Sequence, residues 1–103
     1  MEMVLIYITT KDKAEAGKIG RILLKKRIAG CVNITSGMES LYWWQGKIES
    51  SKEAVLIVKT LLSHSKQLMV EVKKNHSSTC PCILVLPIHT GNPDYLKWLA
   101  DNI

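Results

Sequence analysis

The chain has 103 residues, a length that fits one domain over residues 1–103 and allows it to bury a single hydrophobic core. Hydrophobic residues make up 47% of the sequence, which excludes a disordered chain, and the longest uninterrupted apolar run, residues 3–8, is far too short to cross a membrane. The formal net charge of +5 allows an anionic partner, while Glu2 and the lack of a basic leader argue against a secretion signal.

The first third of the chain predicts a strand followed by a helix. Residues 3–9 are apolar on both alternating sets, which is typical of a strand covered on both faces. Asp12 and Glu15 have the N-cap and N3 spacing of a helix start, and an apolar stripe with helical period follows them. Gly30 is the expected helix stop.

The middle of the chain predicts three extended stretches. Residues 31–34 begin the first, and residues 40–48 continue it after an interruption in which Gly37 is a candidate bulge or turn. The short polar stretch 49–52 has the composition of a hairpin connection. Residues 54–58 then form the next strand, which is apolar on both sides.

The last third predicts a helix, a strand and a terminal helix. Ser63 or Ser65 can cap the first of these helices, and residues 82–88 form the fourth strand. Asn92 opens the last helix, with proline and aspartate in the first turn. The order is therefore βαββαβ plus a C-terminal helix. Right-handed crossovers would place both main helices on one sheet face, which is a ferredoxin-like half-sandwich of the α+β class.

The aromatic segment at residues 40–48 indicates that the domain works as a homo-oligomer. If these residues form one strand, Leu41 and Trp43 point one way while Tyr42, Trp44 and Ile48 point the other, so neither face is polar. Monomers rarely expose a patch of this kind to water. A second copy of the chain is the expected cover. The alternative is a monomer whose C-terminal helix covers this face alone.

Five groups of residues, in order along nearly the whole chain, resemble the CutA divalent-cation-tolerance family. Residues 40–48, SLYWWQGKI, are similar to the family's S-x-Y-x-W-x-G-K-I, and residues 28–33, IAGCVN, are similar to its L-A-A-C-V-N. Glu53 with Lys59-Thr60, His76 with Pro81, and residues 95–99, YLKWL, are similar to its E-x5-K-T, to parts of its H-P-Y-x-x-P-E and to its Y-L-x-W.

The resemblance implies a PII-like homotrimer linked to copper tolerance, with copper binding in some members and no established catalysis. We therefore expect a non-enzymatic protein. Its trimer interface is expected to contain Tyr42, Trp43 and Trp44, and a cleft between protomers is expected to contain Cys31, Lys47, Glu53 and Lys59. The chain departs from the family pattern at Ser77-Ser78, where the family has Pro-Tyr, and at Cys82, where it has Glu. This chain therefore has a thiol where the family pattern has a carboxylate.

The segment 76–82 is the candidate metal site. His76, Cys80 and Cys82 supply an imidazole and two thiols within seven residues, and soft ligands of this kind favour Cu(I) or Zn(II). No cofactor is required by the sequence, but Cu(I), Cu(II) or another divalent metal is a possible ligand. The alternative is that Cys82 is a small core residue and Cys80 a free loop thiol. Three cysteines cannot all pair within one chain, which favours a reducing, cytoplasmic location.

Other function classes lack their expected motifs. A copper chaperone of the ferredoxin-like kind has M-x-C-x-x-C after its first strand, and an acylphosphatase needs an anion-binding arginine loop there, but residues 8–12 read ITTKD. Lys18, Arg21 and Lys25 share one helix face, yet the sequence has no Phe for a base-stacking sheet, so we expect no nucleic-acid partner. Because the longest apolar run is short, we also expect no membrane insertion. The alternative is a structural, interaction or PII-like signalling module. Its trimer would present clefts to a partner or small ligand without physiological metal binding.

Overall fold

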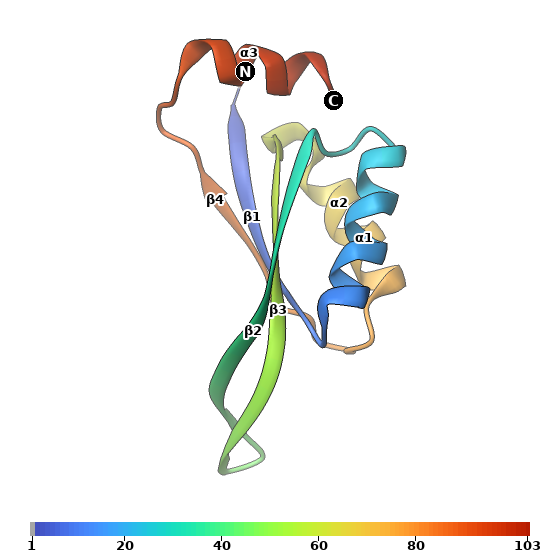
Figure 1. Cartoon of the computed structure of the whole chain (residues 1–103), viewed down its shortest axis with the longest axis vertical. Helices are drawn as coiled ribbons and strands as arrows, with labels where there is room; N and C mark the ends of the chain where they lie inside the picture. Colours follow the sequence, from blue (N-terminus) through green and yellow to red (C-terminus); the bar gives the residue numbers. More distant parts are fainter. Residues whose placement is uncertain (1) are drawn as a thin grey trace.

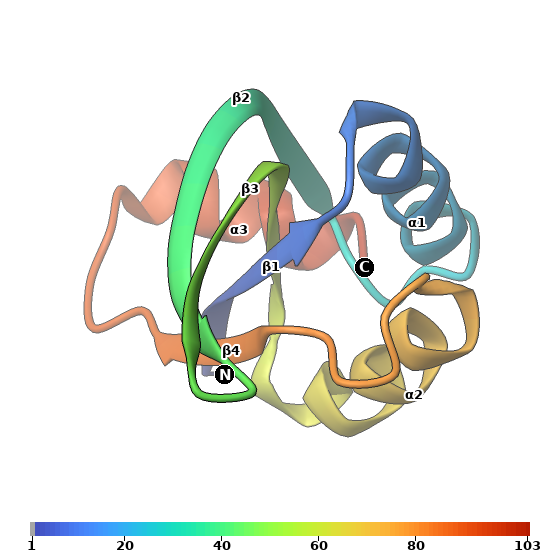
Figure 2. The ribbon, with the colours of Figure 1, turned by 90° about the horizontal axis from the view of Figure 1, so that it is seen from below.

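A computed structural model describes residues 2–103 and contains a four-stranded antiparallel sheet with three α-helices (Figure 1). The elements are β1 (Met3–Thr10), α1 (Lys13–Lys25), β2 (Cys31–Trp44), β3 (Lys47–Leu61), a short 3-10 helix (Leu62–His64), α2 (Ser65–Asn75), β4 (Ile83–Pro87) and α3 (Pro93–Asp101). The strand order is β2-β3-β1-β4, and α1 and α2 lie side by side on one face of the sheet (Figure 2). The predicted α+β, ferredoxin-like half-sandwich with a C-terminal helix is confirmed.

The hydrophobic core lies between the sheet and the α1–α2 layer. Alternate residues of β1, namely Val4, Ile6 and Ile8, are buried there, as the period of two in a strand requires. The rest of the core comes from α1, α2 and β3, including Ile19, Leu23, Leu56, Val58, Leu68 and Val72. The predicted N-cap of α1 is confirmed, since Asp12 Oδ1 accepts a hydrogen bond from the Glu15 amide at 2.8 Å.

The prediction that Gly30 stops the first helix is wrong. The helix ends at Lys25, and Arg27 adopts the left-handed conformation that follows it, with a φ of 58°. Position 30 requires glycine for a different reason, because a Cβ there would lie 2.8 Å from Leu99 Cδ1. The glycine therefore allows α3 to pack closely against the start of β2.

The predicted hairpin connection at residues 49–52 is also wrong. The turn is Gln45–Gly46, whose φ values of 50° and 78° fit a two-residue type I′ turn between β2 and β3. Ile48 is paired with Trp43, so it shares a face with Trp43 and Leu41 rather than with Tyr42 and Trp44. The polar stretch 49–52 belongs to a strand because the β2–β3 ribbon extends beyond the helices, where polar residues meet solvent.

A β-bulge changes which residues of β2 face away from the helices. The pairing register shifts between Thr35 and Met38, and Gly37 lies at this shift with a φ of 77°, which confirms the predicted irregularity there. After the bulge, Met38 is opposite Glu53 and contacts Tyr7 of β1, whose hydroxyl lies 3.6 Å from Met38 Sδ. Tyr42 and Trp44 therefore lie on the sheet face that α1 and α2 leave uncovered.

Helix α3 covers only one end of that face. It packs on β3, where Leu99 is fully buried, and the tip of the β2–β3 ribbon projects from the opposite end of the molecule (Figure 1). Leu84 and Leu86 of β4 stay 56% and 45% exposed on the same face. One terminal helix therefore does not shelter the whole sheet in a single copy.

Candidate functional site

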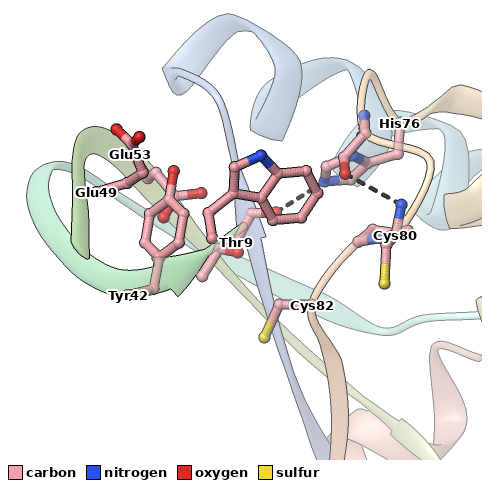
Figure 3. A pocket seen from close by; sticks show the side chains of 10 residues that line it. Thr9, Tyr42, Glu49, Glu53, His76, Cys80 and Cys82 are labelled. Atoms are coloured by element: carbon pink, nitrogen blue, oxygen red, sulfur yellow. Dashed lines mark hydrogen bonds between the residues drawn. The ribbon is translucent and has the colours of Figure 1, made fainter. Parts of the chain in front are cut away.

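A pocket of about 540 Å³ lies where the end of β1, the β2–β3 ribbon and the loop after α2 meet (Figure 3). Its wall contains all three predicted metal residues and two of the three predicted interface aromatics. Its lining residues are Thr9, Tyr42, Trp44, Glu49, Glu53, His76, Ser78, Cys80, Pro81 and Cys82. The fold thus brings the loop thiols opposite two carboxylates of β3, which are far from them in the sequence.

The four predicted cleft residues do not meet within one copy. Cys31 and Lys59 are paired at the α3 end of the β2–β3 ribbon, Glu53 lies in its middle, and Lys47 follows the turn at its tip. Only Glu53 lines the pocket. A cleft containing all four would therefore need residues from more than one copy, as the prediction of an interprotomer cleft requires.

Lys59 is held by α3 rather than free in solvent. Its Nζ donates a hydrogen bond to the Tyr95 hydroxyl at 3.1 Å and lies 5.2 Å from the centre of that ring. The bond to Tyr95 raises the pKa of Lys59, against the opposing effect of its partial burial. This contact joins α3 to β3 beside Cys31.

His76 is engaged at both ring nitrogens. Nε2 lies 2.7 Å from the Thr9 carbonyl oxygen, which can only accept, so Nε2 carries the proton. Nδ1 accepts a hydrogen bond from the Ser78 amide at 3.0 Å. Both ring nitrogens are therefore already bonded, no lone pair is free for a metal, and the side chain is only 5% exposed. His76 holds the loop onto the end of β1, and it would have to release the Ser78 amide before it could bind a metal.

Glu15 has a second role in this region that its sequence pattern did not predict. The pattern placed it only in the first turn of α1. Its carboxylate accepts hydrogen bonds from the Lys11 amide at 3.0 Å, the Ser77 amide at 2.8 Å and the Ser77 hydroxyl at 3.1 Å. Burial raises the pKa of Glu15, but the hydrogen bonds from Lys11 and Ser77 outweigh this effect and lower the pKa from its usual value. The capping spacing locates Glu15 but carries no signal for Ser77, 62 residues away.

The two loop cysteines are free thiols in the wall of the pocket. Cys80 is exposed and Cys82 is half-buried, and both sulfurs point to the same side in Figure 3. Cys82 lines the pocket rather than the core between helices and sheet. Within residues 2–103, no group of three or more His, Cys, Asp and Glu side chains is placed to hold a metal ion. The predicted trio is therefore not preassembled in one copy.

The fold and the pocket together define a small ferredoxin-like protein with a long two-stranded ribbon and a thiol-bearing loop. The family model described as CutA1 divalent ion tolerance protein matches residues 4–102. The chain belongs to the CutA1 divalent ion tolerance family. Among the helices of residues 2–103, none has the length and apolarity to span a membrane.

Relatives of known name support this membership. The divalent-cation tolerance protein CutA of Archaeoglobus fulgidus is 42% identical over 98 residues, 95% of each chain. That of Thermus thermophilus is 41% identical over 101 residues, 98% of this chain and 96% of the relative. The rice protein named CutA 1, chloroplastic, is 37% identical over 99 residues, and the match covers 96% of this chain but only 56% of the relative. The first two names describe tolerance of divalent cations, and none of the three names a reaction.

Solved structures agree in fold over almost the entire chain. The crystal structure of rice CutA1 superimposes with a TM-score of 0.96 at 36% identity, over 99% of this chain and 94% of that chain. The structure described as the periplasmic divalent cation tolerance protein CutA from Archaeoglobus fulgidus gives 0.94 at 41% identity, over 97% of each. The β2–β3 ribbon and α3 are therefore shared features of the family fold.

Proposed function

We propose that this chain is a non-enzymatic homotrimer that binds divalent metal ions or copper and acts in tolerance of or response to them. The observation that carries the proposal is the pair of free thiols, Cys80 and Cys82, in the wall of a pocket that also contains Glu49 and Glu53. Thiolates favour copper and zinc ions, and carboxylates extend the range to harder divalent ions. The donor chemistry of the pocket thus fits the cations in the names of the relatives.

The metal ligands available in one copy are Cys80 and Cys82. A bound ion would supply positive charge that favours the thiolate form of both cysteines. His76 contributes as a ligand only after Nδ1 loses the Ser78 amide, so its first effect is to hold the loop in place. Because two thiolates are fewer than the four ligands of a structural zinc site, the donor set favours Cu(I).

The trimer part of the proposal rests on exposed apolar side chains at the ribbon tip. Leu41, Trp43 and Ile48 share one face and are 69%, 72% and 67% exposed, and Tyr42 and Trp44 are exposed on the other face. Isolated domains rarely leave such a patch in water. We expect sedimentation equilibrium to give a mass near three times 11.6 kDa. A monomeric mass throughout a dilution series would contradict the trimer.

The free cysteines also support a cytoplasmic location. Cys31, Cys80 and Cys82 are all unpaired, which suits a reducing compartment. We propose that the protein meets its metal there, with no nucleic acid or inserted membrane segment involved.

The metal proposal predicts that Cys80→Ser/Cys82→Ser loses most of its Cu(I) binding. Serine oxygen is a poor ligand for Cu(I), so we expect the affinity to fall by two orders of magnitude or more. The measurement is an anaerobic titration against a chromogenic Cu(I) chelator, read alongside native mass spectra with and without copper. Cys31→Ser is the matched control, because Cys31 lies outside the pocket. Unchanged stoichiometry and affinity in the double variant would instead favour a structural or PII-like signalling module.

A further inference from the structure

The charges of this molecule are separated between two regions. We define the helix layer as residues 13–27 and 65–75, which comprise α1, the two residues 26–27 and α2. Counted once each, residues 13–27 (α1 and the two residues after it) and 65–75 (α2) contain nine Lys and Arg residues and two acidic residues, a net charge of +7. The remaining residues have five basic and seven acidic side chains, a net charge of −2. The whole positive excess of the chain therefore lies on the helices.

The two acidic residues of the helix layer do not appear on its outer surface. Glu15 is buried toward the loop after α2, where it binds Lys11 and Ser77. Glu71 is buried between the helices and pairs with Lys26 at 2.8 Å and Lys74 at 3.6 Å. The exposed charged side chains of the layer are consequently all basic, and they include Lys13, Lys18, Arg21, Lys25, Arg27, Lys66 and Lys73.

The shape of the layer decides which anionic partner it fits. α1 and α2 lie side by side over one sheet face, so their outer surface is broad (Figure 2). A helix of 13 residues is about 20 Å long, and two packed helices span a similar width. The four basic positions Lys18, Arg21, Lys25 and Lys73 point outward from the helix faces opposite the buried stripes. A flat ligand that is wide enough to cover both helices and carries dense negative charge would contact both helices at once.

We propose that the helix layer docks peripherally on an anionic phospholipid bilayer, without inserting into it. A bilayer surface is flat and negatively charged, and each Lys or Arg near it strengthens binding by about fivefold. Val70, 54% exposed, follows Lys66 by four residues and precedes Lys73 by three, so one apolar side chain lies among the α2 lysines facing the headgroups. No residue of the helix layer lines the metal pocket, so this inference does not depend on the proposed metal function.

Nucleic acid is the other polyanion that this layer could meet, and the observations favour lipid. Seven of the nine basic residues are lysines, which act as point charges, whereas nucleic-acid recognition favours the planar, bidentate Arg fork and stacking aromatic rings. Neither helix contains an aromatic residue. The helix layer therefore has the exposed lysines that bind anionic headgroups and lacks the aromatic rings on which bases stack.

The test is sedimentation of the full chain with large vesicles of phosphatidylcholine alone or with 30% phosphatidylserine. We expect binding only to the anionic vesicles at low salt, and its loss at high salt. Lys18→Gln/Lys25→Gln/Lys73→Gln should weaken binding about a hundredfold, given about fivefold for each charge. The matched control Lys47→Gln/Lys52→Gln/Lys97→Gln removes the same net charge from the rest of the chain and should retain most of the affinity.

Three results would overturn the proposal. Equal binding to neutral and anionic vesicles would show that the contact is apolar, and equal loss in both triple variants would show that only net charge matters. If a short DNA duplex, added at equal phosphate concentration, displaced the protein from the vesicles, the partner of the layer would be nucleic acid. Far-ultraviolet circular dichroism of each variant confirms that the exposed substitutions leave the fold intact.

Discussion

Trp43→Ala is expected to dissociate the proposed trimer into single chains on dilution. Trp43 is 72% exposed in one copy and lies opposite Ile48, so the assembly must bury most of its ring. Burying about 150 Å² of an indole at about 25 cal/mol per Å² contributes about 3–4 kcal/mol per copy. Three copies then lose about 10 kcal/mol, which raises the dissociation constant by about seven orders of magnitude. Sedimentation velocity over a dilution series measures this change.

Trp98→Ala is the matched control for the interface prediction. Trp98 is 49% exposed on α3 and stacks on Tyr95, with ring centroids 5.7 Å apart, so the same substitution is made away from the ribbon. We expect this variant to keep the mass of the wild-type assembly. If Trp98→Ala dissociated the protein and Trp43→Ala did not, the interface would lie at α3, and the assignment of Tyr42, Trp43 and Trp44 would fail.

Glu15→Gln is expected to lower the free energy of unfolding by about 2–3 kcal/mol at neutral pH. The carboxylate accepts from two backbone amides and a hydroxyl, and an amide side chain cannot accept all three without directing its own NH₂ at a donor. Urea unfolding at one protein concentration measures the loss, since assembly couples to stability. Glu39→Gln is the control, because Glu39 is exposed and accepts only one bond, from Ser50 at 3.4 Å.

The same variant makes a prediction about pH. Because folding lowers the pKa of Glu15 below 4.5, the folded state favours the ionised carboxylate. Its stabilising contribution is therefore complete above pH 4.5 and is lost as the pH falls through the folded-state pKa. We expect the difference in stability between wild type and Glu15→Gln to disappear in that acidic range. A difference that persisted unchanged below it would exclude the charge of Glu15 as its cause.

Local patterns in the sequence predicted much of this fold. The N-caps at Asp12 and Asn92 hold as predicted, and Asn92 Oδ1 accepts from the Asp94 amide at 3.1 Å. The irregularity at Gly37 and the order of strands and helices also hold. Each depends on residues within one turn or one strand, where the chain itself keeps the interacting groups close. The local predictions of a helix stop and of a hairpin turn failed. The helix stop was placed at Gly30, although α1 ends at Lys25. The hairpin turn was placed at residues 49–52 instead of Gln45–Gly46, because a polar stretch is equally compatible with a turn and with an exposed strand.

The sequence by itself determined the element order, the N-caps of α1 and α3, and the identity of the thiols and aromatic residues available for function. The predicted cap of α2 at Ser63 or Ser65 is wrong, since His64 occupies that position without a side-chain bond. Only the tertiary structure decided that Met38 contacts Tyr7, that both nitrogens of His76 are engaged, and that Glu15 anchors Ser77. The physical reason is distance along the chain. Pairing register and buried hydrogen bonds between residues far apart are chosen by packing of the whole domain, and no local pattern specifies them.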